Sequence, residues 1–384
     1  MLCRRFRFRR YQLKKDSLRA LTEGHPWIFR GALSSAAEVF PDGQWLALVD
    51  GQNRPVGFGI YQAEGAVGIR VLRPGATPPD SEWLQRKLNR ALERRADLRR
   101  RVQGFRALNG ESDGFPGVVL DVYGRIGVLQ TYCAGVDSLG RYAASLACRS
   151  LDLVGLLWKP PQRRSGPAAP VQRVLYGQVP RCVAFDEEGM QLVADLEGGQ
   201  KTGLFLDLRG LRRWIRNCEL KGRRVLNLFS YTGTLGLAAE LAGAREIWQV
   251  DASAQALAFA GHHHVQDPTR HRLLEADVFE WIKELSEDEL FDLVVVDPPA
   301  LTTRADQVER VLARQARLLS RAAAHLAPGG TLVACDCTSR IPRTRFQQML
   351  KKAVPLRHRH TLLPEEDHAP RFAEADYLKV EIYR

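Results

Sequence analysis

The stretch Arg223–Gly233, RRVLNLFSYTG, decides the fold, because it joins a short apolar strand to a helix through a tight turn. Val225–Phe229 is mostly apolar and has the length of a strand, and the alanine- and leucine-rich residues Leu235–Leu241 follow as a helix. A strand, a glycine turn and a helix open a nucleotide-binding α/β sheet, in which ligands bind at the carboxyl ends of the strands. We therefore expect a ligand site at this turn.

The residues of the turn narrow the class of ligand. Gly233 is its single glycine, accompanied by Ser230 and Thr232, and the G-x-G-x-x-G pattern of dinucleotide-binding turns is missing. Such a turn suits an adenosine-type ligand that carries no pyrophosphate. S-adenosylmethionine is the first such cofactor to test.

The composition is that of a globular protein with two or three domains. The chain has 384 residues, 45% of them hydrophobic, and no apolar run approaches the roughly 20 residues of a membrane span. The first fifteen residues, MLCRRFRFRRYQLKK, are basic but no apolar segment follows them, so we expect no signal peptide. A cytosolic protein without membrane contact is the resulting expectation.

The charge of the chain favours a polyanionic partner. The net charge is +12, and arginine and lysine are concentrated in residues 1–30 and 86–106. Basic clusters of this kind bind the phosphates of RNA or DNA through counterion release. The alternative is that arginine is used on every solvated helix face, and we favour nucleic-acid binding over it.

Cysteine and histidine indicate neither disulfides nor a metal site. None of the scattered cysteines forms a C-x-x-C pair; they are Cys3, Cys133, Cys148, Cys182, Cys218, Cys335 and Cys337. The adjacent histidines His262–His264 point in different directions on a helix and have no second ligand cluster. We interpret them as a solvated helix end.

The first half of the chain is expected to hold two small domains. Short strands between glycine turns in residues 1–75 predict a β-barrel, with strands at Trp45–Val49, Val56–Tyr61 and Val67–Leu72. A helix with an apolar stripe is expected from Ser81, a plausible N-cap, to Arg101. Together with further strands, a helix at Leu139–Cys148 and a loop at residues 159–173, it forms a predicted middle α/β domain at residues 80–185.

Residues 186–384 show alternating strand and helix patterns. The strands are expected at Arg224–Phe229, Glu246–Val250, Leu273–Glu275, Leu293–Val296 and Thr331–Cys335. Strands that are apolar along their whole length, separated by helices, predict a parallel sheet covered on both faces.

Acidic residues follow three of these strands, where the fold predicts a site. Asp251 is placed to accept hydrogen bonds from ribose hydroxyls, or to cap the following helix, or both. Asp277 is placed to receive an adenine amino group. Asp297 follows four apolar residues in LVVVDPP, where a carboxylate is costly to bury without partners, and two prolines then fix the loop.

Cys337 lies just past the fifth strand, in TLVACDCTS. Strand cysteines are usually inert, but this one falls at the same end of the sheet as Asp297 and Gly233. A thiol there is suited to attack an electrophilic ring carbon. Cys335 lies inside the strand and fits a structural role better.

Six motifs occur in order along the chain: HPW at His25–Trp27, GESDGFPG at Gly110–Gly117, GQKTGLFLDLR at Gly199–Arg209, NLFSYTG at Asn227–Gly233, DPP at Asp297–Pro299 and DCT at Asp336–Thr338. With these motifs the chain resembles, nearly end to end, bacterial 5-methylcytosine methyltransferases of large-subunit ribosomal RNA that carry an N-terminal PUA domain. The resemblance implies an α/β fold with a PUA barrel at residues 1–75 and a class I (Rossmann-like) methyltransferase domain at residues 186–384.

The resemblance also implies site residues and partners. The cofactor S-adenosylmethionine would lie among Phe229, Ser230, Tyr231, Thr232, Gly233, Asp251, Ala252, Asp277, Val278 and Asp297, with Lys201, Thr202 and Asp207 closing over cofactor and substrate. Cys337 corresponds to the catalytic cysteine, and ribosomal RNA is the implied partner. Members of the family are often dimeric, so a homodimer is one expectation that the sequence itself does not decide.

The implied chemistry uses both Cys337 and Asp297. Attack of a thiolate on cytosine C6 makes C5 nucleophilic enough to accept a methyl group, and Asp297 is expected to hydrogen-bond the base at N3/N4. The target base must be unpaired or flipped, and the sequence does not name the base that removes the C5 proton.

Three alternatives stay open. A related group methylates guanine N7 and needs no thiol, so Cys337 is the discriminating residue. Methyltransferases of exocyclic amines favour an aromatic residue after DPP, where this chain has Ala300. A PUA-type RNA-binding protein without catalysis would not bind S-adenosylmethionine.

Overall fold

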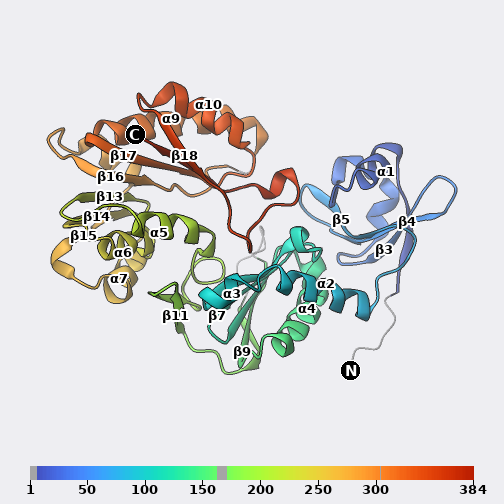
Figure 1. Ribbon diagram of the computed structural model, residues 1–384. Coiled ribbons are helices and arrows are strands. Elements are labelled where there is room, and N and C mark those ends of the chain that lie inside the picture. Colours follow the sequence, from blue (N-terminus) through green and yellow to red (C-terminus); the bar gives the residue numbers. More distant parts are fainter. Residues whose placement is uncertain (1–6, 162–170, 303) are drawn as a thin grey trace. The chain divides into compact units, whose positions relative to one another are not determined.

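The computed structural model describes residues 7–161, 171–302 and 304–384, which form two compact units (Figure 1). Unit 1 contains residues up to Leu204 together with Glu366–Phe372, and unit 2 contains Phe205–Glu365 and Ala373–Arg384. Within the described ranges, no helix is both long enough and apolar enough to cross a bilayer.

The first sheet of unit 1 contains the three strands that the sequence predicts between residues 45 and 72. Its order is β1-β3-β4-β5-β2, and a small core under it includes Tyr11, Ile28 and Leu46. The elements are β1 (Arg9–Gln12), α1 (Lys15–Thr22), β2 (Trp27–Phe29), β3 (Trp45–Val49), β4 (Pro55–Tyr61) and β5 (Val67–Pro74).

A second sheet of unit 1, in the order β10-β9-β8-β7-β6, packs against two longer helices. The elements are α2 (Ser81–Glu93), α3 (Leu98–Arg101), β6 (Gly104–Asn109), β7 (Val118–Tyr123), β8 (Ile126–Thr131), α4 (Asp137–Ser150), β9 (Gly155–Lys159) and β10 (Arg173–Gly177), followed by the hairpin β11 (Cys182–Glu187) and β12 (Met190–Asp195). Of the loop predicted at residues 159–173, residues 162–170 lie outside the described ranges.

The single helix predicted from Ser81 to Arg101 is wrong in two respects. The chain forms two helices, because α2 ends at Glu93 and α3 starts at Leu98. The N-cap of α2 is Asp80 and not Ser81, since the Asp80 side chain accepts a hydrogen bond from the backbone of Trp83 at 2.7 Å.

A short segment from near the C-terminus, Glu366–Phe372, completes unit 1. Asp367 is fully buried there: its carboxylate accepts the backbone N–H of Arg106 at 2.9 Å, and its carbonyl accepts Arg95 at 3.1 Å. We call this segment the C-terminal strap. It is anchored to β6 and to the segment between α2 and α3, although it is distant from both in sequence.

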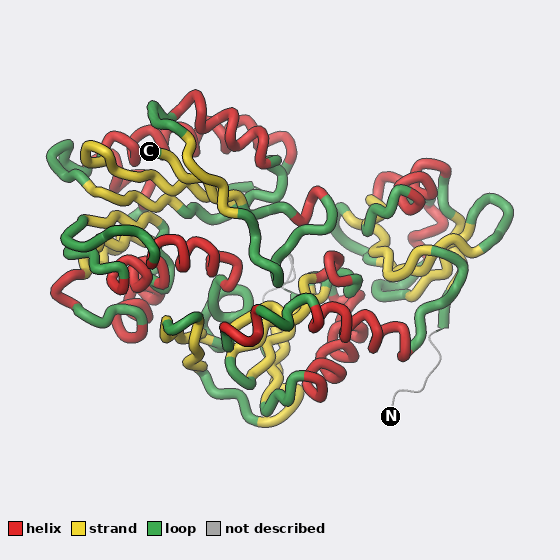
Figure 2. The backbone as a smooth tube through the Cα atoms, viewed as in Figure 1, coloured by secondary structure: helices red, strands yellow, loops and turns green. Residues whose placement is uncertain are grey.

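Unit 2 is a seven-stranded sheet in the order β15-β14-β13-β16-β17-β19-β18 (Figure 2). Its elements are α5 (Arg209–Arg216), β13 (Arg224–Leu228), α6 (Thr234–Leu241), β14 (Glu246–Asp251), α7 (Ala254–His263), β15 (His271–Glu275), α8 (Val278–Glu284), β16 (Phe291–Val296), α9 (Val308–Ala324), β17 (Leu326–Asp336), α10 (Arg343–Ala353), β18 (His358–Leu362) and β19 (Lys379–Tyr383). All five strands predicted from the sequence are present.

The prediction of a parallel sheet holds for β13 to β17 and is wrong for β19. This strand lies between β17 and β18 and runs antiparallel to both, because the chain reverses direction between β18 and β19. Alternate strand residues such as Leu226 and Leu228 pack on α8 to α10, and α5 to α7 cover the opposite face. The sheet is therefore covered on both faces, as predicted.

Candidate active site

The turn after β13 has an unusual backbone. Phe229, Tyr231 and Gly233 all have positive φ angles, of 61°, 47° and 76°. A left-handed conformation costs a non-glycine residue about 1–3 kcal/mol and persists where the surrounding structure enforces it, often at ligand sites. Here the backbone N–H of Ser230 bonds the Val250 carbonyl at 3.1 Å, and that of Gly233 bonds the Ser230 carbonyl at 2.9 Å.

Gly233 is required at its position for two reasons. Its φ of 76° favours glycine, and a β-carbon there would lie 2.8 Å from the Ala260 Cβ and 3.0 Å from Gln249 Oε1. A β-carbon at Gly236 would lie 2.3 Å from the same Gln249 oxygen. The start of α6 is therefore packed closely against β14 and α7.

Asp251 ties the turn to the next loop. One carboxylate oxygen accepts the backbone N–H of Tyr231 at 2.7 Å, and the other accepts that of Ser253 at 2.9 Å. The alternative that Asp251 caps the following helix is wrong, because Ser253 is the N-cap of α7. The half-buried carboxylate thus lies at the carboxyl end of β14, beside the turn.

Asp277 lies at the end of the β15 loop and caps α8, since its carboxylate accepts the backbone N–H of Phe279 at 2.8 Å. Val278 after it is buried in the core. The ring of Phe279 packs edge-on against that of Phe229, with centroids 5.4 Å apart. Asp277 and Phe229 therefore belong to neighbouring loops at one edge of the sheet.

A buried polar network lies directly under the turn. Asn227 donates to Gln249 at 3.4 Å, Gln249 bonds His271 at 3.0 Å, and His271 lies 3.0 Å from Glu240. Within the described part of the chain, Asn227 Oδ1 and Ser230 Oγ are buried and have no hydrogen-bond partner. An unsatisfied buried polar atom costs about 1–3 kcal/mol, so these atoms fit a turn that is completed by a polar ligand.

His264 supports the turn from below, and the interpretation of His262–His264 as a solvated helix end is wrong for this residue. His264 is fully buried, and its Nδ1 donates to the Thr232 carbonyl at 2.6 Å. Burial is the main cause that lowers the pKa of His264 to about 4, and the nearby Arg212 acts in the same direction. The described residues contain no cluster of three or more metal-ligating side chains.

Cys337 and Asp297 lie on adjacent loops. Asp297 follows β16, and its backbone N–H bonds the Leu228 carbonyl at 3.3 Å. Cys337 follows β17, which is the next strand in the sheet, and its sulfur lies 3.6 Å from the Pro298 carbonyl. The structure thus brings the thiol, the D-P-P loop and the end of β13 together at one sheet edge.

The two cysteines of this strand differ in environment. Cys335 is fully buried, and burial followed by the charge of Asp297 raises its pKa well above the ordinary range of a thiol. Cys337 is partly exposed. A thiol that stays protonated is a poor nucleophile, so Cys337 is the one of the two that is suited to covalent chemistry.

Lys379 is a site residue that the sequence reasoning missed. It is fully buried at the start of β19, where it forms an ion pair with Asp336 at 2.7 Å and donates to the Thr338 carbonyl at 2.8 Å. Burial lowers the pKa of Lys379, and the interactions with Asp336 and Cys337 act in the opposite direction. A cation so placed stabilises a thiolate. The signal was a lysine inside the otherwise strand-like LKVEIY.

Asp207 and its neighbour Phe205 also reach this edge. Tyr377 donates its hydroxyl to the Asp207 carboxylate at 2.6 Å, and the Phe205 ring lies 5.2 Å from that of Tyr231. Lys201 and Thr202 belong to unit 1, where buried Thr202 donates to Asp121 at 2.6 Å. Their predicted closure over the ligand therefore stays a prediction, as does contact of Ala252 with the cofactor.

A covered, mainly parallel sheet with a nucleoside-type turn after its first strand defines the class I methyltransferase fold. Residues 161–384 match the family described as S-adenosylmethionine-dependent methyltransferase, and residues 12–74 match a PUA-like domain. The chain belongs to this methyltransferase family, and its cofactor is S-adenosylmethionine.

Individual relatives match over nearly the whole chain. A ribosomal RNA large subunit methyltransferase of Deinococcus radiodurans is 34% identical, over 96% of both chains. Ribosomal RNA large subunit methyltransferase I of Shewanella denitrificans is 30% identical, over 96% of this chain and 98% of that one. The crystal structure of SMU.776 complexed with SAH shares the fold, with a TM-score of 0.85 at 22% identity over 98% of this chain and 100% of that one.

Proposed function

We propose that the protein is an RNA methyltransferase that forms 5-methylcytosine in large-subunit ribosomal RNA. The names of its full-length relatives support this substrate. The observation that carries the choice of reaction is the place of Cys337, which lies beside the D-P-P loop and near the buried ammonium of Lys379. Methyl transfer to guanine N7 needs no thiol at this edge.

The residues around the turn fit S-adenosylmethionine. Asp251 would accept hydrogen bonds from the ribose, and the Phe229–Gly233 turn with its unsatisfied Ser230 hydroxyl would hold the amino-acid part. The adenine would lie by Asp277 and Val278, near the Phe229 ring. Asp207 and Asp297 would complete the pocket. The bound cofactor supplies an electrophilic methyl group.

The reaction then follows from the chemistry of cytosine and of this chain's residues. The Cys337 thiolate adds to C6, and electrons move to C5, which becomes enamine-like. C5 then takes the methyl group as the S–CH3 bond of the sulfonium breaks, and S-adenosylhomocysteine is the leaving group. Asp297 hydrogen-bonds the base at N3/N4 and holds it during the addition. Loss of the C5 proton to a base then expels the Cys337 thiolate and restores the aromatic ring. Lys379 favours the thiolate both before attack and as the leaving group.

The domain plan belongs to the same proposal. Residues 1–75 would form the PUA-like RNA-binding domain, residues 80–185 the middle domain and residues 186–384 the catalytic domain, with Lys201 and Thr202 closing over cofactor and substrate. The proposal includes a homodimer, which a measurement of the molecular mass in solution would test.

The test uses Cys337→Ala and Cys337→Ser with undermethylated ribosomal RNA and labelled S-adenosylmethionine. Both variants are expected to lose turnover while they keep cofactor affinity, because the thiol is needed for chemistry and not for binding. Nucleoside analysis of the wild-type product should show 5-methylcytosine. Wild-type turnover in Cys337→Ala, with label in 7-methylguanine, would instead establish the guanine-N7 reaction. Absence of cofactor binding in the wild type would indicate a non-catalytic RNA-binding protein.

A further inference from the structure

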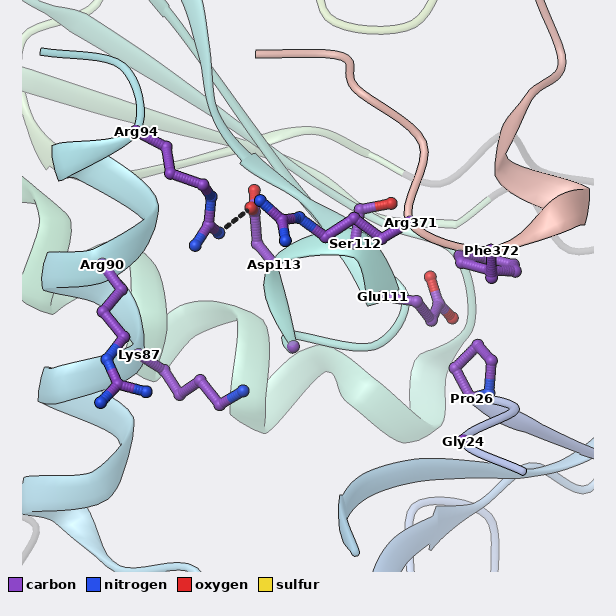
Figure 3. Close-up of a pocket in the computed structure, with 11 residues that line it drawn as sticks. Gly24, Pro26, Lys87, Arg90, Arg94, Glu111, Ser112, Asp113, Arg371 and Phe372 are labelled. Carbon is purple, nitrogen blue, oxygen red and sulfur yellow. Dashed lines mark hydrogen bonds and ion pairs between the residues drawn. The ribbon is translucent and has the colours of Figure 1, made fainter. Parts of the chain in front are cut away.

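A cavity in unit 1 is lined by parts of two motifs to which the proposed reaction gives no role. Its volume is about 250 Å3, and it opens between the loop before β2, helix α2, the GESDG turn and the C-terminal strap (Figure 3). Gly24 and Pro26 line it from the HPW region, and Glu111 and Asp113 line it from the GESDGFPG motif. We call it the basic pocket.

Positive charge converges on the basic pocket from two segments. Lys87, Arg90 and Arg94 are spaced so that they share one face of α2, and Arg371 approaches from the strap. The neighbouring charges of Arg90 and Arg94 add to burial in lowering the pKa of Lys87. Neighbouring cations repel one another, and a bound anion would reduce this electrostatic repulsion.

The two carboxylates of the pocket are already used by other partners. Asp113 forms ion pairs with Arg94 at 2.5 Å and with buried Arg95 at 2.6 Å, and it accepts the backbone N–H of Asn109. Glu111 pairs with Arg70 and accepts the indole N–H of Trp27 at 2.7 Å. Asp113 thus has two arginine partners and Glu111 has one, and none of these ion pairs involves Lys87, Arg90 or Arg371.

Three cations remain for a ligand. Among residues 7–161, 171–302 and 304–384, Lys87, Arg90 and Arg371 form no ion pair with a carboxylate. Lys87 lies against Gly114, where a β-carbon would lie 3.1 Å from its Nζ. Gly114 has a φ of 76°, which favours glycine, and a larger residue there would crowd the Lys87 side chain.

An aromatic cluster borders the pocket. Phe372 lines it and packs edge-on against Trp27, with centroids 5.0 Å apart, and the ring of His25 lies 5.6 Å from that of Phe29. Phe29 is a large apolar side chain that is 39% exposed. Cations that hold phosphates next to rings that stack on bases are the usual arrangement in proteins that bind single-stranded nucleic acid.

We propose that the basic pocket binds a backbone phosphate of single-stranded RNA, and that the aromatic cluster with Phe29 stacks an adjacent base. The inference rests on the proposed function for RNA as the substrate class. It assigns the HPW and GESDGFPG motifs to substrate binding and not to the chemical step. Arg90 and Arg371 are then phosphate ligands, whereas Glu111 and Asp113 hold other arginines in place.

The test is RNA binding by the full chain, measured by anisotropy of a labelled single-stranded oligoribonucleotide at several salt concentrations. The variant is Arg90→Ala/Arg371→Ala, and Arg86→Ala/Arg149→Ala is the matched control. The control removes the same charge from exposed arginines of the same unit that do not line the pocket. Each lost phosphate contact should weaken binding about fivefold at 0.1 M salt, hence about 25-fold for the pair, and lower the log–log salt slope by about 1.4.

A second variant examines the base contact. Phe29→Ala should weaken RNA binding by about fivefold or more and leave the salt slope unchanged, because stacking releases no counterions. Wild-type affinity and slope in the pocket variant would overturn the proposal, and so would an equal loss in the control. The pocket variant could also keep RNA binding but lose binding of inorganic pyrophosphate or of polyglutamate. Either result would overturn the proposal, the first in favour of a small anion and the second in favour of an acidic protein.

The failure of the pocket can be told apart from the failure of the proposed reaction. Calorimetry with S-adenosylmethionine should give wild-type affinity in the pocket variant, since its residues lie in unit 1 and the turn lies in unit 2. If the wild-type chain makes no 5-methylcytosine, the reaction is refuted, whereas the RNA-binding comparison still decides the pocket.

Discussion

Replacement of Lys379 by methionine tests whether the active-site edge depends on one buried charge. The substitution keeps the length of the side chain but removes the ammonium that pairs with Asp336 at 2.7 Å. Both partners are fully buried, and breaking such a pair costs about 3–5 kcal/mol, because the remaining carboxylate has no compensating charge. In a unit of this size, that loss corresponds to a fall in melting temperature of roughly 6–20 °C.

The double variant Lys379→Met/Asp336→Asn separates stability from reactivity. It removes the unpaired carboxylate and should recover much of the lost stability, but the charge near Cys337 is still missing. Alkylation of Cys337 by iodoacetamide, followed by peptide mass analysis across pH, measures the thiolate directly. We expect at least about a tenfold slower reaction at pH 7 in Lys379→Met, where the Asp336 charge remains, and a smaller slowing in the double variant, with both profiles moved to higher pH. An unchanged alkylation profile in the stable double variant would refute the role of Lys379.

Three further predictions concern the turn. The pKa of His264 is about 4 in the folded chain and near 6.5 when unfolded, so the unfolded state binds more protons as the pH falls from 6.5 to 4. Urea unfolding should therefore show about 2 kcal/mol less stability at pH 5 than at pH 7 from this residue, and His264→Gln should reduce that difference. Asp251→Ala should weaken S-adenosylmethionine binding about tenfold or more by calorimetry, and unchanged affinity would refute its ribose role. Gly236→Ala should destabilise unit 2 by about 1–3 kcal/mol in denaturant titration, because its β-carbon would overlap Gln249. Ala239→Gly, in the same helix, is the comparison variant, because it causes no overlap and costs only the loss of one methyl group and of helix propensity.

The fold of unit 2 was predictable because its signals are local. Apolar strands such as Val225–Leu228 and Leu293–Val296 alternate with helices, and each one carries its own pattern of periodicity. The predicted strand ends then located Asp251, Asp297 and Cys337, because parallel strands end at a common edge.

What the sequence did not reveal depends on contacts between distant residues. His264 looks like a member of a polar surface triplet, but it is buried because its ring fits under the Thr232 carbonyl. The break between α2 and α3 follows from tertiary packing, since buried Arg95 donates to the Arg106 carbonyl and pairs with Asp113. No periodic pattern predicts contacts of that kind.

The antiparallel direction of β19 explains how a lysine near the end of the chain reaches the thiol. In the register of β17 and β19, Lys379 is directly opposite Asp336, the residue before Cys337. If β19 ran parallel to β17, its first residue would lie at the opposite edge of the sheet, and its last residue, Tyr383, would take that place. The reversal of β19 is therefore the feature of the fold that completes the proposed nucleophile site. Substitution of Lys379 therefore tests the proposed mechanism, although this residue is distant from Cys337 in the sequence.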